Sequence, residues 1–147
     1  MFMFSQSDVE IVQQYWFSIA PNGDDIAASF YQDLFEKFPE YRKYFTSDRE
    51  AQQEKLIRMI NIVINGVTVW EVIRPEIVKL GQFHAEIADF GKKDYQNIVN
   101  TLLGVMERYR GIPDERATEA WLNLFALISD TMMQAADEFS SKNKITF

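Results

Sequence analysis

Cysteine is absent from all 147 residues of the chain, and histidine occurs only once, at position 84. Without a thiol the chain can form no disulfide, no zinc-thiolate site and no iron–sulfur cluster, and it has no cysteine nucleophile. A single histidine also excludes zinc motifs built on two histidines. No GxSxG motif accompanies it, so the sequence gives no support to a serine–histidine–acid triad.

Positive charge is scarce as well. The 15 lysines and arginines are outnumbered by 22 aspartates and glutamates, which gives a formal net charge of -7. Proteins that bind nucleic acid usually carry a basic stripe, and none is present. No window approaches 18 uninterrupted apolar residues, and residues 1–10 lack the basic leader and apolar run of a signal peptide. We therefore expect a cytoplasmic protein that binds neither nucleic acid nor a membrane.

Helix-breaking residues are few, with prolines only at positions 21, 39, 75 and 113. Between them apolar residues recur at helical spacing and not in the alternation of strands. A chain of this length with 47% apolar residues can bury one core. We predict one all-α domain over residues 1–147, with six or seven helices and loosely ordered tails at 1–6 and 140–147.

Capping and breaking signals give the expected helix boundaries. Ser47 and Glu50 fit a capping box, Gly66 is a reasonable stop, and Pro75 is expected to begin the segment that carries His84. The expected helices cover residues 5–20, a second stretch ending at 38, a short turn or helix at 39–45, residues 48–65, a segment from 75 to the turn at 89–94, a stretch ending near 109, and residues 114–139.

His84 interrupts an apolar stripe formed by Ile77, Leu80 and Ile87 at steps of three and four residues. A histidine on such a face is often a hydrogen-bonded core residue. One histidine is nevertheless sufficient to hold a haem iron axially. The residues upstream of His84 decide between these readings.

The upstream residues follow a regular pattern. Tyr31, Pro39 and Phe45 stand at intervals of eight and six residues, and Gln52 and Leu56 lie one helical turn apart. In this spacing they resemble the globin family, in which a tyrosine of the second helix, a proline that opens the third, a phenylalanine that wedges against haem and two positions on the ligand side of the haem stand at these intervals.

The segment "LGQFH" then places Leu80 four residues before His84. In these features the chain resembles the globin family, and in particular bacterial single-domain globins and the haem domain of flavohaemoglobins. The resemblance extends from the first helix to Trp121 in the last. It implies a globin fold of six to eight helices around a pocket for haem b, with His84 as the axial ligand of the iron.

The resemblance also implies the other residues of the pocket. Tyr31 and Gln52 are the expected donors to bound oxygen, which takes charge from ferrous iron, and each such bond contributes about 1.5 to 3 kcal/mol. The remaining cofactor contacts expected from the resemblance are Phe45, Lys55, Leu56, Leu80, Phe83 and Tyr95.

Two departures from the flavohaemoglobin pattern concern spacing. The link between Phe45 and Gln52 is shorter than in flavohaemoglobins, so a register with Gln53 and Ile57 in the pocket stays open. We prefer Gln52, which shares a helical face with Leu56. The run from residue 84 to residue 95 is about one residue longer than the family pattern, which predicts a bulged turn.

A third departure lies on the proximal side. Flavohaemoglobins place a glutamate in the last helix beside the axial imidazole, and the corresponding position here is Ala136, followed by Asp137. We therefore expect the carbonyl of Leu80 to accept the second imidazole N–H of His84. An imidazole without an acidic partner donates less electron density to iron, which argues against peroxidase chemistry.

The expected function is a haem protein that binds oxygen and also takes nitric oxide and carbon monoxide. Nitric oxide dioxygenation is the reaction that the resemblance favours, but no GxGxxG motif marks a dinucleotide domain, so a separate reductase would be required. A gas sensor and an oxygen store are alternatives within the same class. A haem-free globin-like signalling or interaction module is the alternative from another class.

Overall fold

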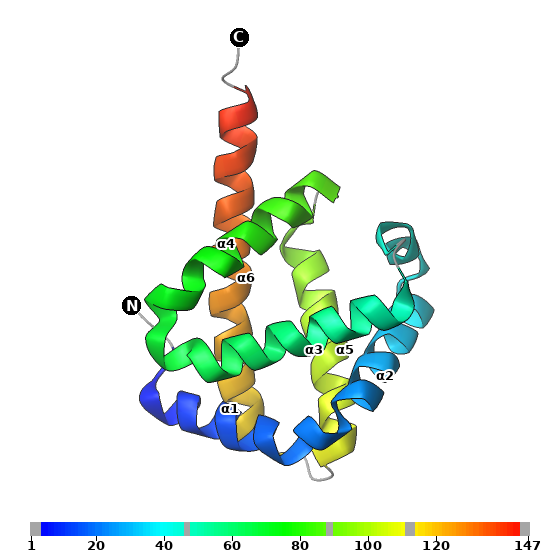
Figure 1. Ribbon diagram of the computed structural model, residues 1–147, viewed down its shortest axis with the longest axis vertical. Coiled ribbons are helices and arrows are strands. Elements are labelled where there is room, and N and C mark those ends of the chain that lie inside the picture. The colour runs from blue at the N-terminus through cyan, green and yellow to red at the C-terminus, as the bar shows by residue number, and fades with distance from the viewer. Residues whose placement is uncertain (1–3, 46–47, 88–89, 111–113, 145–147) are drawn as a thin grey trace.

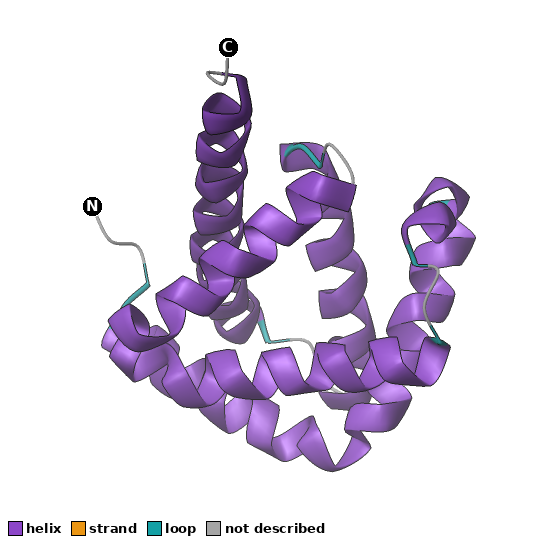
Figure 2. Ribbon diagram, turned by 45° about the horizontal axis from the view of Figure 1, so that its top comes forward, coloured by secondary structure: helices purple, strands orange, loops and turns teal. Residues whose placement is uncertain are grey.

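The computed structural model describes residues 4–45, 48–87, 90–110 and 114–144 (Figure 1). Within these ranges the chain forms helices and no strand, which confirms the all-α prediction (Figure 2). The elements are α1 (Gln6–Ile19), η1 (Ala20–Asn22), α2 (Gly23–Lys37), η2 (Pro39–Tyr44), α3 (Arg49–Gly66), η3 (Val67–Val69), α4 (Trp70–Ile87), α5 (Lys92–Arg110) and α6 (Glu115–Lys144), where η denotes a 3-10 helix.

Short polar side chains begin the helices. Ser5 caps α1 by a capping box with Asp8, in which each side chain accepts the other residue's backbone amide. Asp48 caps α3 and accepts the amide of Ala51 at 3.3 Å. The predicted cap, Ser47, lies outside the described residues; the N-cap of α3 is Asp48, so the helix begins one residue later than predicted.

The prediction that a helix begins at Pro75 was also wrong. α4 begins at Trp70, directly after η3, and Pro75 lies inside it. Proline has no N–H and therefore leaves the carbonyl of Glu71 without its helical hydrogen bond. Both residues are exposed, so water can bind that carbonyl. The helix tolerates the proline because the lost bond is at the surface and near the helix start.

Both terminal helices reach into the expected tails. Ser5 caps α1, and Phe4 before it is only 3% exposed. At the other end α6 continues to Lys144, past the predicted end at residue 139, and its last turns extend beyond α4 and α5 (Figure 1). Residues 1–3 and 145–147 lie outside the described residues.

The helices surround a core rich in aromatic side chains. α6 packs against α1 and α4, while α2 packs against α3 and α5. Trp16 and Trp121 are almost fully buried, and the indole of Trp16 donates to the side-chain oxygen of Asn61 at 2.8 Å. This bond and the surrounding apolar contacts fix α1 against α3. The group of α1 and α6 and the group of α2, α3 and α5 together position α4, the helix that carries His84.

Arg49–His84 is the one stretch of the described chain that is long and apolar enough to cross a membrane. Its most apolar 18 residues have a mean hydropathy of 1.6, and 28% of that window is buried. The stretch consists of α3 and α4, which run in different directions on either side of η3 (Figure 1). Length and composition alone are weak evidence for a span, and the absence of membrane binding stays a prediction.

α4 and α6 approach each other closely at Gly81. A Cβ atom built on Gly81 would lie 2.7 Å from both the Cα and the carbonyl oxygen of Met132 on α6. Backbone atoms cannot rotate out of the way, so only glycine permits this distance. Because His84 follows one turn later, this contact sets the depth of its imidazole.

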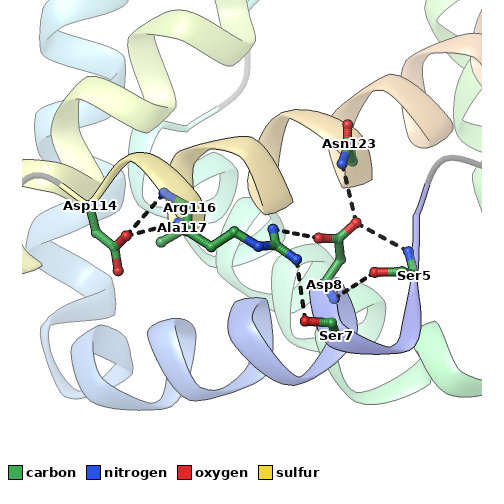
Figure 3. Close-up of polar contacts among 7 residues, drawn as sticks. All are labelled: Ser5, Ser7, Asp8, Asp114, Arg116, Ala117 and Asn123. Carbon is green, nitrogen blue, oxygen red and sulfur yellow. Dashed lines mark hydrogen bonds and ion pairs between the residues drawn. The ribbon is translucent and has the colours of Figure 1, made fainter.

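A buried carboxylate joins α1 to α6. Asp8 is 2% exposed, and it accepts hydrogen bonds from the amide of Ser5 at 3.1 Å and from Asn123 at 3.2 Å (Figure 3). Arg116 forms an ion pair with it at 2.7 Å. Burial by itself raises the pKa of Asp8, but these three partners together hold it below its ordinary value of 3.8.

We predict that Asp8→Asn destabilises the protein by about 2 to 3 kcal/mol at neutral pH, because the charged hydrogen bonds to Asp8 are lost. A carboxyl whose pKa is lowered by folding stabilises the fold above pH 3.8, and this stabilisation disappears as the pH falls below that value. Urea unfolding at neutral pH and below pH 3.8 measures the difference. Asp137→Asn, at an exposed site on α6, is the control. An equal gap between wild type and Asp8→Asn at both pH values would contradict the role of the charge.

We predict that Gly81→Ala lowers the free energy of unfolding by about 1 to 3 kcal/mol, because its methyl group overlaps the backbone of α6. Gly104→Ala on α5 is the matched control, since no atom lies within 4 Å of its added Cβ. That variant should be neutral or gain up to about 1 kcal/mol from helix propensity. Denaturant titration of both variants checks the prediction, and equal stabilities would mean that α4 does not depend on this contact.

Candidate functional site

His84 lies on α4 with its imidazole half-buried. Burial lowers the pKa of His84 below its ordinary value of 6.5, so the ring is neutral at neutral pH. Its Nδ1 is buried and has no hydrogen-bond partner among the described residues. The predicted bond to the carbonyl of Leu80 is therefore absent, because that carbonyl accepts the helical backbone amide and the ring faces other groups.

Aromatic rings surround the imidazole. The ring centroid of Phe90 lies 5.8 Å from that of His84 with an interplanar angle of 83°. Tyr95 on α5 lies 6.4 Å away and Phe83 on α4 lies 6.3 Å away. Sequence reasoning missed Phe90, because it stands in the segment between two helices that was read only as a turn. A large aromatic residue beside the turn glycine was the available signal.

The two predicted proximal aromatics differ in exposure. Tyr95 is 7% exposed, and burial raises its pKa to about 12. Phe83 is 55% exposed, so its ring is largely open to solvent in this structure. Leu80, also predicted, is partly buried against the core.

Tyr31 and Phe45 lie together on the other side of the predicted pocket. Their ring centroids are 5.6 Å apart, and Phe35 packs against both at 6.0 and 5.4 Å. Tyr31 is 7% exposed, and burial raises its pKa to about 12, so the phenol keeps its proton. The hydroxyl donates to the backbone carbonyl of Gln52 at 3.4 Å. The predicted pair of Tyr31 and Gln52 is therefore brought together.

The start of α3 determines which side chains face Tyr31. Gln52 and Gln53 are both half-buried, and Leu56 and Ile57 both pack against the core. The side chain of Ile57 faces the start of α2, where it would lie 3.5 Å from a Cβ on Gly23. It also lines an open surface cavity of about 700 Å³. Leu56 does not line that cavity.

This cavity is separate from the predicted site. It lies along the outer face of α3 and the start of α4, with Asp24, Arg58 and Val72 among its lining residues. None of the predicted cofactor contacts lines it. Lys55, predicted to reach the cofactor, is exposed and makes no ion pair with any residue in the described ranges.

The end of η2 connects the two sides of the site. Tyr44 packs on Phe90, with centroids 5.4 Å apart, and the next residue, Phe45, packs on Tyr31. On α6, Ala136 is half-buried and Asp137 is exposed, and neither accepts a hydrogen bond from Nδ1 of His84. In the described residues the imidazole of His84 thus has aromatic contacts and no acidic partner at Nδ1.

The described residues fit a metal held by a flat macrocycle and a single protein ligand. They contain no group of three or more histidine, cysteine, aspartate or glutamate side chains that could hold an ion by themselves. The buried side-chain atoms without a partner in this part of the chain are Nδ1 of His84 and Nε1 of Trp121, and of these two side chains only the imidazole can bind a metal. A neutral imidazole among aromatic rings matches the proximal side of a haem.

The comparison with known folds agrees with this geometry. A bacterial globin from Campylobacter jejuni superposes with a TM-score of 0.81 at 18% sequence identity, over 93% of this chain and 99% of that chain. At this identity the likeness shows the fold alone.

The family comparison rests on the sequence. The globin family model matches residues 28–132, a range that begins in α2 and ends at the residue of α6 that meets Gly81. This range includes every predicted site residue from Tyr31 to Tyr95 and more than two thirds of the chain. Since sequence and fold lead to the same family, the chain belongs to the globins.

Proposed function

We propose that the chain binds one haem b, with His84 as the axial ligand of its iron. The observation that carries the proposal is the neutral, half-buried imidazole of the chain's single histidine, which lies among aromatic rings. An iron ligand must be neutral and must keep one nitrogen lone pair free. When bound, haem supplies a coordination position for oxygen, nitric oxide or carbon monoxide.

Tyr31 is the proposed donor to the bound gas. Its phenol stays protonated, and its present acceptor is a carbonyl at 3.4 Å, a long hydrogen bond that a closer and more charged acceptor can replace. Gln52 is the proposed second donor, with Leu56 beside it. This register is supported by the proximity of Tyr31 to Gln52 and by the position of Ile57, which faces Gly23 instead.

The remaining proposed contacts enclose the cofactor. Phe45, Leu56, Leu80 and Tyr95 supply apolar surface that excludes water from the pocket, and Phe83 would gain cover from the macrocycle. Lys55, exposed at the rim, is placed on the same helix as Gln52 and is proposed to pair with a haem propionate.

The proposed reaction is nitric oxide dioxygenation with a separate cytoplasmic reductase. Two donors, Tyr31 and Gln52, favour slow release of a charge-bearing ligand, which suits a reaction of the held gas better than an oxygen store. A gas sensor would need the same pocket without turnover. Consumption of nitric oxide by the reduced, oxygenated protein separates the enzyme from the sensor and the store.

We predict that His84→Ala abolishes stoichiometric haem ligation, because the chain contains no other imidazole and no thiolate. An absorption titration of the purified protein with haem measures the loss. Lys79→Ala, at an exposed position on the same helix, should bind as wild type does. Free imidazole should restore the spectrum of His84→Ala by entering the vacated space.

Two outcomes contradict this assignment. If His84→Ala keeps the wild-type ferrous and ferric spectra, another group holds the iron. If wild type itself gives no Soret band at one-to-one stoichiometry, the chain is a haem-free globin module.

We predict that Tyr31→Phe speeds oxygen dissociation by about tenfold to a hundredfold, the equivalent of one hydrogen bond to a charged acceptor. Carbon monoxide carries less charge, so its dissociation should change less. Gln52→Leu should act in the same direction but more weakly, whereas Gln53→Leu serves as the register control. Stopped-flow ligand displacement gives both rates. Equal effects on the two gases would mean that Tyr31 does not face the ligand.

A further inference from the structure

The plane of the His84 imidazole is fixed by packing. Nδ1 makes no hydrogen bond to any group in the described part of the chain, so no acceptor there sets the ring's rotation. Phe90 meets the imidazole almost at a right angle, at 83° and 5.8 Å between centroids. An edge-to-face contact of this kind is directional, because the positive edge of one ring faces the negative face of the other.

Phe90 in turn is held by tyrosines of η2. Tyr44 meets it at 5.4 Å and 71°, and Tyr41 meets it at 6.1 Å and 74°. The ring centroid of Tyr95 lies 6.1 Å from that of Phe90. The ring that orients His84 therefore lies among side chains of η2 and α5, and its position depends on how these two elements are joined.

Asp94 on α5 joins these two elements by hydrogen bonds. One carboxylate oxygen accepts the phenol of Tyr41 at 2.6 Å, and the other accepts the backbone amide of Gly91 at 2.9 Å. Asn97 donates to the phenol oxygen of Tyr41 at 3.1 Å. Since Gly91 directly follows Phe90, a single carboxylate holds both the backbone beside the Phe90 ring and one of the rings packed on it. Tyr41 is 4% exposed, so water does not compete easily for its phenol.

We propose that Tyr41 and Asp94 are positioning residues that fix the plane of the His84 imidazole through Phe90. They take the place of the missing hydrogen bond from the Nδ1 position of His84 to a protein acceptor. Neither residue touches the imidazole in a ring contact or a hydrogen bond. The consequence for iron ligation rests on the proposed haem function, but the orientation of the ring does not.

The chain offers an unusually direct readout, because its only histidine gives one NMR signal for each ring C–H group. Phe90→Leu in the haem-free protein should shift the His84 signal, because it removes the ring current of Phe90 while those of Phe83 and Tyr95 remain. Tyr41→Phe should move or broaden the same signal, since it deletes only the hydroxyl that Asp94 accepts. Asp94→Asn should do likewise, because an amide can accept only one of the two hydrogen bonds.

Tyr109→Phe is the matched control. Its hydroxyl lies 3.5 Å from that of Ser29 and has no part in the cluster around Phe90, so the His84 signal should stay unchanged. Circular dichroism establishes that each variant is folded. If Phe90→Leu moves the His84 signal while folded Tyr41→Phe and Asp94→Asn leave it in place, the positioning role is overturned. An unchanged signal in Phe90→Leu overturns the packing contact itself.

A second readout uses the haem-loaded protein. The iron–imidazole stretching band in the resonance Raman spectrum of the ferrous form should shift or broaden in Tyr41→Phe and not in Tyr109→Phe. If wild type binds no haem, the proposed function fails while the NMR result still decides the positioning role. If wild type binds haem and both tyrosine variants give the wild-type band and the wild-type NMR signal, the proposed function stands and the positioning role fails.

Discussion

The close approach of α4 to α6 at Gly81 is the constraint on which the site depends. The backbone of α6 at Met132 leaves no room for a Cβ at Gly81, so a larger residue there would force α4 and α6 apart. Because His84 lies about one turn after Gly81 on α4, this contact determines how deeply its imidazole is buried. Phe90, which precedes α5, and Tyr95 on α5 pack against the imidazole, and the tyrosines of η2 pack in turn on Phe90.

In this acidic chain, four aspartate side chains join or cap elements of secondary structure. Asp8 binds α1 to α6, Asp48 and Asp114 cap α3 and α6, and Asp94 ties α5 to η2. Each carboxylate accepts backbone amides near a helix N-terminus, where the helix dipole favours negative charge. These four residues give part of the surplus of acidic groups a structural use.

The sequence was sufficient to predict the helices and the family but not the details that depend on tertiary contact. Helical periodicity between the prolines identified the elements, and the spacing from Tyr31 to His84 led to the globins. Pro75 was predicted to begin a helix because proline removes a helical hydrogen bond, which is costly inside a buried helix. Here the carbonyl that loses this bond is exposed to water, so the helix continues through Pro75. Phe90 and the Tyr41–Asp94 bond could not be found from spacing, since they join segments 53 residues apart. The prediction that the carbonyl of Leu80 accepts a hydrogen bond from His84 was wrong, because the rotation of a side chain depends on tertiary contacts that cannot be predicted from the local sequence.

Pro75 divides α4 into two parts of unequal stability. In the turn before Pro75 the carbonyl of Glu71 lacks its helical hydrogen bond, and Val72 is 72% exposed. After Pro75, Ile77 is buried and Gly81 lies directly against the backbone of α6. Amide protons in the first part are therefore less protected from exchange with solvent than those near His84. We infer that local unfolding of α4 is easier before Pro75 than at the glycine contact. Fraying of the helix toward η3 and displacement of His84 are then separate events.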